Sequence, residues 1–359
     1  MQSRVLNLII TSHGFGHAVR VASVAGLIKK LYPEIVIIFT TSAPRWLLES
    51  YLEDDFIYRP RSFDVGVIQA DSLTMDKQTT LAQMQQLQKS SRRIVASEVN
   101  YLKNNRVNLV LADIPNLAPL IAQGAGIPCW MMGNFGWDFI YRPWGGEFTA
   151  IADWIAQGYQ QCDRLFRLPL SESMSAFTNI TDVGLTGGTP KYALQELKAK
   201  FGITSPTEQT VLLTFGGLGL QKIPYENLNN FPQWQFITFD SQAPNLPNLI
   251  KVQDYHYRPV DFMPLCGRVI SKPGYSTFAE ALRLDIPIIS LTREGFAESS
   301  LLLDGLQEYA WNQIVSGKEF SQSNWEFLTK PLIAPQTEKP LCKNGTEVIA
   351  NQVLEYFRE

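Results

Sequence analysis

Short apolar runs recur along this chain, and each is followed by a turn and then by apolar residues at helical spacing. The first run, Val5–Ile10, leads through a turn with two glycines into Val21, Val24, Ala25 and Ile28. Continuous apolar runs that alternate with amphipathic helices are typical of a parallel sheet with helices on both faces. We therefore expect an α/β fold, in which ligands bind beyond the carboxyl ends of the strands.

This alternation occurs twice, so we predict two Rossmann-like domains, each with a doubly wound parallel sheet. Strand-like runs at Val107–Leu111 and Ile127–Met132 belong to the first series, and the second series begins at Val211–Phe215. Between the two series, Gly187-Gly188-Thr189-Pro190 is loop-like. The expected organisation is an N-terminal domain over 1–167, a linker over 168–190, a C-terminal domain over 191–340, and a C-terminal helix over 341–359 that packs across the domain junction.

The turn after the first apolar run contains Gly14, Gly16 and His17. Glycines in a strand-to-helix turn let the backbone approach a ligand closely, and the helix N-terminal amides can face an anion. The turn is not a dinucleotide-binding fingerprint, because the third glycine would fall at Val19 and no acid follows the next strand. His17 is placed where a general base can act; the alternative is a structural histidine in a tight turn.

A second strand-to-helix turn, Lys272–Gly274, predicts another anion site. Ser276 and Thr277 follow it, and Glu280 lies one turn into the expected helix, where its carboxylate can accept hydrogen bonds from vicinal ribose hydroxyls. The spacing of Thr277 and Glu280 also matches a capping box, which needs no ligand. Lys272 is either a phosphate partner or a surface charge.

Two more loops of the C-terminal half follow strands. Gly216 and Gly217 come after one strand, and Arg293 and Glu298 come after another. Arg293 can offset phosphate charge, and Glu298 can accept hydrogen bonds from sugar hydroxyls. The alternative for this second loop is a solvated charged surface.

Polar residues also follow two strands of the N-terminal half, namely Asp113 and the loop Asn134–Asp138. Because the carboxyl ends of parallel strands meet at one edge of a sheet, we expect these residues to converge with His17. Asp113 is the expected partner that orients the His17 ring, Asp138 is a competing candidate, and His13 is expected to support the loop.

Composition excludes several other classes of protein. The net charge of −3 argues against a nucleic-acid partner, and no apolar run reaches the ~18 residues that span a bilayer. The N-terminus lacks a small-residue cleavage site, so we expect no signal peptide. The four cysteines are scattered, which favours a reduced, cytoplasmic protein. Peripheral membrane contact through apolar surface loops stays open.

A metal site is not expected either. The chain has no C-x-x-C pair and only three histidines, and it lacks the D-x-D motif that anchors Mn²⁺ or Mg²⁺ in metal-dependent sugar-nucleotide transferases. If a nucleotide diphosphate binds, backbone amides and cationic side chains must therefore offset its charge. We expect no cofactor.

Taken together, these segments resemble GT-B glycosyltransferases, which have two Rossmann-like domains facing a cleft. The pattern Gly14-x-Gly16-His17-x-x-Arg20 is similar to the first loop of the bacterial N-acetylglucosaminyltransferase that forms lipid II. The chain more closely resembles the glycosyltransferase-like N-terminal half of plant L-arabinokinases. The matching segments are Gly14–Ala18, Gln69–Asp76, Asn134–Tyr141 and Gly274–Ala281.

The resemblance implies a UDP-sugar as the donor substrate, bound mainly by the C-terminal domain, and an unidentified acceptor, bound mainly by the N-terminal domain. In particular, it implies that Glu280 binds the ribose, while Glu298-Ser299 only loosely matches the pair that grips the donor sugar in relatives. The alternative for the aromatic residues on the acceptor side is that they belong to the hydrophobic core, where aromatic clusters are common. The expected donor-binding residues are Gly14, Gly16, Gly216, Gly217, Lys272, Gly274, Ser276, Thr277, Glu280, Arg293 and Glu298, and the expected acceptor-side residues are Asn134, Trp137, Asp138 and Tyr141.

The resulting hypothesis is metal-independent transfer of a sugar from a UDP-sugar to an acceptor hydroxyl, with His17 and Asp113 as catalytic residues. A hydroxyl is a poor nucleophile, so a base must remove its proton as the bond forms, which typically contributes ~10²–10⁴-fold to the rate. Two alternatives stay open. One is a UDP-sugar epimerase of the same fold, although such enzymes use several carboxylates and histidines, and this chain has few histidines. The other is a noncatalytic nucleotide-sugar-binding module.

Overall fold

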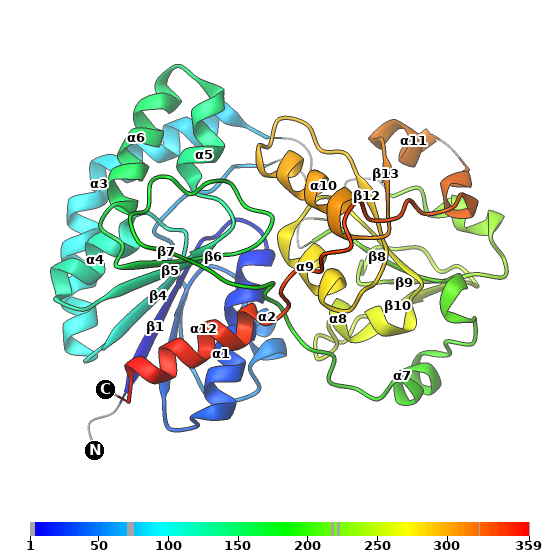
Figure 1. Cartoon of the computed structure of the whole chain (residues 1–359), viewed down its shortest axis with the longest axis horizontal. Helices are drawn as coiled ribbons and strands as arrows, with labels where there is room; N and C mark the ends of the chain where they lie inside the picture. The colour runs from blue at the N-terminus through cyan, green and yellow to red at the C-terminus, as the bar shows by residue number, and fades with distance from the viewer. Residues whose placement is uncertain (1–3, 70–74, 217–218, 221–222, 323, 359) are drawn as a thin grey trace. The chain divides into compact units, whose positions relative to one another are not determined.

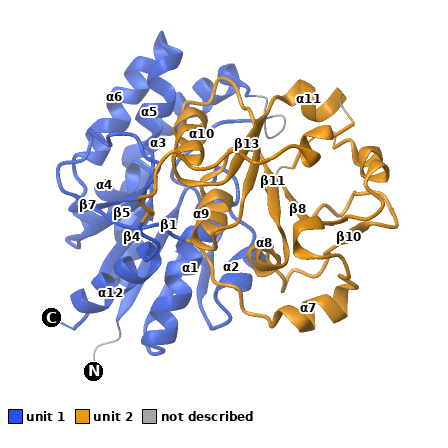
Figure 2. Cartoon of the chain, turned by 45° about the vertical axis from the view of Figure 1, so that its right-hand side comes forward, with its two compact units in different colours: residues 1–70, 74–186, 342–359 blue, residues 71–73, 187–341 orange. Residues whose placement is uncertain are grey.

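The computed structural model describes residues 4–69, 75–216, 219–220, 223–322 and 324–358. The chain divides into two compact units (Figure 2): unit 1 comprises residues 1–70, 74–186 and 342–359, and unit 2 comprises residues 71–73 and 187–341. Each unit contains its own parallel sheet (Figure 1), which confirms the predicted α/β architecture. The chain leaves unit 1 after Thr186, inside the segment expected as a linker, and returns at Cys342.

The sheet of unit 1 has the order β3-β2-β1-β4-β5-β6-β7, and all of its strands are parallel. The strands are β1 (Val5–Ile10), β2 (Val36–Thr40), β3 (Ile57–Arg59), β4 (Leu109–Asp113), β5 (Cys129–Gly133), β6 (Arg164–Arg167) and β7 (Ile180–Asp182). Leu6 pairs with both Ile37 and Leu109, so β1 is central. Every residue of β1 and β4 is buried, as expected for strands covered on both faces.

The helices of unit 1 follow the strands in sequence. They are α1 (Gly16–Leu31), α2 (Arg45–Tyr51), α3 (Lys77–Asn104), α4 (Leu117–Ala125), α5 (Trp137–Tyr141), α6 (Glu147–Tyr159) and α12 (Gly345–Tyr356), with the 3₁₀ turn η1 (Arg142–Trp144). The first strand and helix lie where the apolar spacing predicts them. The turn between them therefore stands at the carboxyl edge of the sheet.

The C-terminal helix α12 belongs to unit 1 and packs against α1 (Figure 1). Its apolar side chains Ile349 and Val353 are fully buried, as the spacing of apolar residues predicts. The segment that leads into it is hydrogen-bonded to the segment that leaves unit 1, because the Leu185 amide donates to the Cys342 carbonyl at 2.8 Å. A contact of this helix with the other domain stays a prediction.

The sheet of unit 2 has the order β10-β9-β8-β11-β12-β13, again with parallel strands. The strands are β8 (Thr210–Thr214), β9 (Gln235–Thr238), β10 (Leu249–Lys251), β11 (Arg268–Ser271), β12 (Ile288–Leu291) and β13 (Asn312–Val315). The helices are α7 (Leu194–Phe201), α8 (Pro259–Phe262), α9 (Tyr275–Arg283), α10 (Glu298–Tyr309) and α11 (Gly317–Gln322), and the 3₁₀ turns are η2 (Thr207–Gln209), η3 (Tyr225–Asn230), η4 (Met263–Leu265) and η5 (Glu326–Thr329).

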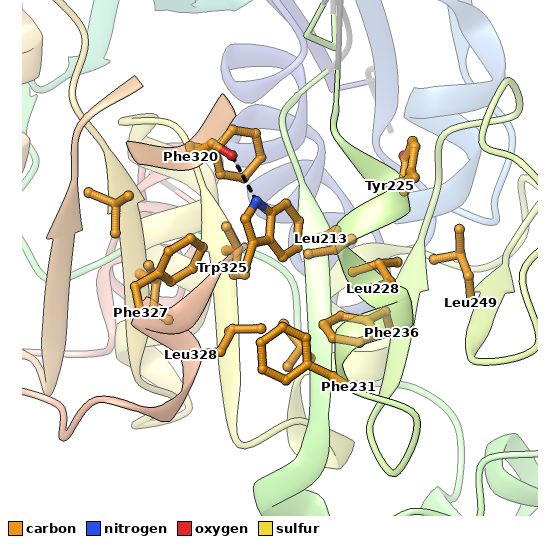
Figure 3. Packing of buried hydrophobic residues seen from close by; sticks show 14 of the residues in the cluster. Leu213, Tyr225, Leu228, Phe231, Phe236, Leu249, Phe320, Trp325, Phe327 and Leu328 are labelled. Carbon is orange, nitrogen blue, oxygen red and sulfur yellow. Dashed lines mark hydrogen bonds between the residues drawn. The ribbon is translucent and has the colours of Figure 1, made fainter. Parts of the chain in front are cut away.

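An aromatic core supports β8 and β9 of unit 2 (Figure 3). Trp325 is fully buried in it, and its indole Nε1 donates a hydrogen bond to the carbonyl oxygen of Phe320 at 2.8 Å. Phe236 from β9 and Leu213 from β8 belong to the same cluster. Aromatic side chains of this size bury ~150–250 Å² each, so the cluster holds these strands, and hence their carboxyl ends, in place.

Candidate active site and nucleotide site

A buried cluster of charged and polar side chains lies at the carboxyl ends of β4 and β5 in unit 1. His17 and Arg20 are three residues apart on α1 and share one face of the helix. Asp113 ends β4, and Nδ1 of His17 lies 2.9 Å from its Oδ1. The guanidinium of Arg20 binds both carboxylate oxygens of Asp113, at 2.5 and 2.6 Å, and donates to Oδ1 of Asn134 at 2.7 Å. The structure thus brings together residues from three separate segments.

The hydrogen bonds of this cluster define its protonation. Burial raises the pKa of Asp113, but the charges of Arg20 and His17 and their hydrogen bonds outweigh it and hold the pKa below its ordinary value of 3.8. An ionised carboxylate can only accept, so the contact with Oδ1 favours a proton on Nδ1 of His17. Nη2 of Arg20, which can only donate, lies 3.1 Å from the same nitrogen, but it already donates a shorter bond to Asp113 at 2.6 Å. The lone pair of the ring is then on Nε2, as a general base requires.

The imidazole of His17, only 8% exposed, packs among aromatic side chains. The ring centroids of Phe135 and Trp137 lie 5.7 and 6.4 Å from it, and Trp137 stacks on Tyr141 at 5.8 Å. The hydroxyl of Tyr141 donates to the carbonyl oxygen of Gly66. Trp137 and Tyr141 are buried and act as packing residues in this structure, so their direct contact with an acceptor stays a prediction.

The glycine turn before α1 is held from one side by His13. Gly14 has a φ of +71°, a conformation that favours glycine, and α1 begins at Gly16. The backbone amide of Val67 donates to Nδ1 of His13 at 3.3 Å, and the His13 ring lies edge-on to Trp137 at 5.1 Å. His13 therefore stands in the loop-supporting place that the sequence predicts for it.

Asp138, the competing partner of His17, does not bind it. It lies in the first turn of α5, and its Oδ1 is buried without a hydrogen-bond partner among the described residues. Burial raises the pKa of Asp138 above its ordinary value. Among the described residues it forms no hydrogen bond with His17, so Asp113 is the carboxylate that orients the ring.

In unit 2, the loops after β11 and β12 bring the cationic side chains of Lys272 and Arg293 to the carboxyl edge of the sheet. Lys272 follows β11 and lies against Gly216, because a Cβ atom at Gly216 would be 3.5 Å from Cε of Lys272. Burial and the nearby charge of Arg293 lower the pKa of Lys272 to about 8, although Glu298 acts in the opposite direction. Within the described part of the chain, Nζ of Lys272 has no hydrogen-bond or ion-pair partner. Such a lysine is suited to receive an anion.

Glu280 and Arg283 of α9 hold the loop at Gly187–Gly188. Oε1 of Glu280, whose side chain is 3% exposed, accepts a hydrogen bond from the Gly188 amide at 2.9 Å. Arg283 donates to the carbonyl oxygens of Gly187 and Gly188 at 2.5 and 3.0 Å. A Cβ atom at Gly187 would lie 2.6 Å from Cγ of Glu280, so only glycine fits there.

The capping-box alternative for Glu280 is wrong. Helix α9 begins at Tyr275 with Gly274 as its N-cap, so Thr277 is already the third helical residue. Ser276 is buried in the first turn of the same helix.

The remaining predicted donor residues lie in the loops around this site. Arg293 is 8% exposed, and its guanidinium lies 4.1 Å from the ring centroid of Phe296. Glu298 is the first residue of α10 and is 7% exposed, so the alternative of a solvated charged surface is wrong for Arg293 and Glu298. Gly217 lies outside the described residues, as do residues 70–74 of the segment Gln69–Asp76.

Sequence reasoning assigned no role to Arg20 or Asp64. Arg20 carries a signal that can be recognised, since it follows His17 by three residues on a helix and so faces the same way. Asp64 lies in a segment without regular secondary structure after β3, and nothing in its local sequence indicates that it approaches Trp137.

Comparison with solved structures decides the fold. CalG4, the calicheamicin glycosyltransferase, superposes with a TM-score of 0.60 at 11% identity and covers 99% of this chain and 95% of its own. The UDP-GlcNAc 2-epimerase from Neisseria meningitidis bound to UDP-GlcNAc has a TM-score of 0.57 at 17% identity and covers 98% of this chain and 100% of its own. The chain has the GT-B fold. Glycosyltransferases and epimerases share it, so the fold alone does not distinguish them.

One curated protein is similar in sequence to the GT-B chain. L-arabinokinase from Arabidopsis thaliana is 28% identical over 352 residues, which is 95% of this chain and 33% of the relative. The chain therefore spans about a third of the length of the relative it matches. No family model matches the sequence.

The described residues contain neither a cluster of metal-binding side chains nor a membrane-spanning helix. Residues 4–69, 75–216, 219–220, 223–322 and 324–358 contain no group of three or more His, Cys, Asp or Glu side chains placed to hold a metal ion. No helix within the same ranges is both long and apolar enough to cross a membrane.

Proposed function

We propose that this protein transfers a sugar from a UDP-sugar to the hydroxyl of an acceptor without a metal ion. One observation carries the proposal: Nδ1 of His17 lies 2.9 Å from Oδ1 of the buried Asp113, a contact that favours Nε2 as the nitrogen that accepts a proton. The fold supports it, since glycosyltransferases such as CalG4 superpose on the chain. The similarity in sequence to L-arabinokinase, a protein that by its name acts on a sugar, also supports the proposal.

Unit 1 supplies the base in this reaction. Nε2 of His17 takes the proton of the acceptor hydroxyl while its oxygen forms a bond to the anomeric carbon of the donor. The bond from that carbon to the phosphate oxygen breaks, and UDP leaves with the electron pair. The imidazolium that forms is stabilised by the ionised Asp113, whose second oxygen is neutralised by Arg20.

Unit 2 supplies the donor site. Lys272 and Arg293 lie close enough to influence each other electrostatically, and the diphosphate of a nucleotide sugar relieves this repulsion. Amides at the start of α9 and around Gly216 add hydrogen bonds to phosphate oxygens. Glu280 then binds the ribose, as the resemblance implies.

We include metal independence in this proposal because unit 2 supplies two cationic side chains near the expected diphosphate. Lys272 and Arg293 provide positive charge where the leaving diphosphate gains negative charge, which is the role of a divalent cation in other transferases. The compartment is proposed to be the cytoplasm, because Cys129, Cys162 and Cys266 are free thiols buried in the two units.

A thermal-shift screen against nucleotide sugars, in EDTA, tests the donor. A ligand that binds only the folded state at a hundredfold excess over its Kd adds ~2.7 kcal/mol of apparent stability. UDP and at least one UDP-sugar should raise the melting temperature of the wild type, and Lys272→Met should reduce that rise. Lys251→Met, at a lysine of β10 that donates to Ala243, is the matched control that keeps the full rise. No shift with any nucleotide sugar contradicts the proposal.

The superposed UDP-GlcNAc 2-epimerase favours one alternative, conversion of the donor itself. Product analysis separates the outcomes. Release of UDP when a sugar acceptor is added indicates transfer, and an epimerised nucleotide sugar without UDP release indicates the epimerase. Binding without either product indicates the noncatalytic module.

A further inference from the structure

Asp64 connects three loops at the carboxyl edge of the sheet in unit 1. Its Oδ2 accepts a hydrogen bond from the indole Nε1 of Trp137 at 3.0 Å, and its Oδ1 accepts one from the backbone amide of Ser12 at 3.3 Å. Ser12 follows β1, Asp64 follows β3 and Trp137 follows β5. One carboxylate therefore connects the turn before α1 to the loop that carries Trp137.

The environment of Asp64 differs from that of Asp113. Asp64 is 8% exposed, and among the described residues it forms no ion pair with an arginine or lysine. Burial raises its pKa above the ordinary value, although hydrogen bonds from Ser12 and Trp137 and the charge of His17 act against this rise. A buried carboxylate without a cation is costly, so simple packing does not account for it.

The groups bound to Asp64 are those that surround His17. The Trp137 ring lies 6.4 Å from the His17 ring, centroid to centroid, and the indole can only donate, so an acceptor at Asp64 fixes its orientation. The Ser12 amide precedes the glycine turn that leads into His17. The other titratable groups that sense the charge of Asp64 are the phenols of Tyr141 and Tyr159.

We propose that Asp64 is a positioning residue that holds the His17 ring in place through Trp137 and through the turn at Ser12. Asp113 sets which nitrogen of His17 carries the proton, while Asp64 sets where the ring stands. The inference rests on the proposed function of His17 as the base, but the geometry is testable without an assay of transfer.

The histidine rings give a direct readout, because the chain contains only His13, His17 and His256. Nitrogen-15 NMR of histidine-labelled protein reports the tautomer of each ring, and the His17→Ala variant assigns the His17 signals. In the wild type, we expect His17 to be the Nδ1–H tautomer.

Trp137→Phe removes the indole donor, and Asp64→Asn replaces one of the two accepting oxygens with an NH₂ donor, so the new side chain can no longer accept from both Trp137 and Ser12. Asp64→Asn keeps the shape and removes an unpaired buried charge, so we expect it to fold. In both variants the His17 signals should shift and broaden toward a mixture of tautomers, and the double variant should match either single variant.

Matched controls are Glu98→Gln, at a buried carboxylate paired with Arg59, and Trp130→Phe, at a tryptophan of β5 that packs on Phe166. Both should leave the His17 signals as in the wild type. If Asp64→Asn is folded and its His17 signals are unchanged, the inference is wrong. Additive shifts in the double variant also overturn it.

An activity arm follows once a donor and acceptor are known. A misplaced base lowers kcat by about 10²-fold and leaves KM for the donor unchanged. If the wild type transfers no sugar, the proposed function fails, and the NMR result still decides the placement of His17. A fall in kcat with unchanged His17 signals contradicts positioning by Asp64.

Discussion

Asp113 accepts a hydrogen bond from Nδ1 of His17 at 2.9 Å, and both side chains are buried at the carboxyl edge of the first sheet. The pair depends on Arg20, which neutralises the carboxylate from one turn further along α1. Without that guanidinium, burial would raise the pKa of Asp113, and the carboxylate would be a weaker partner for an imidazolium.

Arg20→Met should destabilise unit 1 by about 3–5 kcal/mol, because it leaves the carboxylate of Asp113 buried without its cation. Urea unfolding followed by fluorescence measures the loss. Arg167→Met is the control, since Arg167 pairs with the exposed Asp182 and a surface pair contributes at most ~1 kcal/mol. Equal effects of the two substitutions would mean that the buried pair has no special importance.

Acid should weaken the fold through Asp113. Its pKa is lowered in the native state, so its contribution to stability is present above the ordinary value of 3.8 and is lost as the pH falls through the lowered native value. The free energy of unfolding of the wild type should therefore decrease below about pH 4 more steeply than that of Asp113→Asn. Parallel pH profiles of the two proteins would contradict the lowered pKa.

The lowered pKa of Lys272 predicts that nucleotide binding depends on pH. Its pKa of about 8 means that the free protein carries this cation below pH 8 and loses it above. A bound diphosphate retains the proton, so the affinity for UDP should be constant below pH 8 and should fall by up to about tenfold per pH unit above it. Calorimetry at pH 7 and 9 measures the change.

The control for this titration is Lys272→Arg, because a guanidinium stays charged across the range. It should bind UDP equally at both pH values. If its affinity falls as much as that of the wild type, another group is responsible for the pH dependence.

Glu280 should matter in two separable ways. Glu280→Gln retains an oxygen for the Gly188 amide but loses the negative charge, whereas Glu280→Ala loses both. If Glu280 binds ribose, both variants should weaken UDP binding, by about 1.5–3 kcal/mol for a hydrogen bond to a charged group. If Glu280 serves only the loop, calorimetry will show a loss in Glu280→Ala alone.

Much of this architecture could be predicted from the sequence. Apolar runs such as Val5–Ile10 identified the central strands because strands covered on both faces have no polar alternation. Short edge strands such as β3 and β7 were not predicted, since three residues are too few for a periodic signal. The long helix α3 was missed because its sequence is mostly polar.

The candidate site could likewise be predicted from the sequence only in part. His17 and Asp113 could be placed at one edge because strand ends converge in a parallel sheet. Contacts made through irregular segments could not: Asp64 reaches Trp137 from a loop, and Glu280 reaches Gly188 across 92 positions of sequence. Such pairs depend on the path of the folded chain and have no local pattern.

The proposed function depends on His17 as the base of a metal-independent transfer. The direct measurement is UDP release from UDP-sugars in EDTA with a panel of monosaccharide acceptors, comparing the wild type with His17→Ala. We expect acceptor-dependent UDP release with a new glycoside as product, reduced by about 10²–10⁴-fold in His17→Ala while the affinity for UDP is unchanged. Undiminished release by His17→Ala, or no acceptor-dependent release by the wild type, would contradict the proposed function.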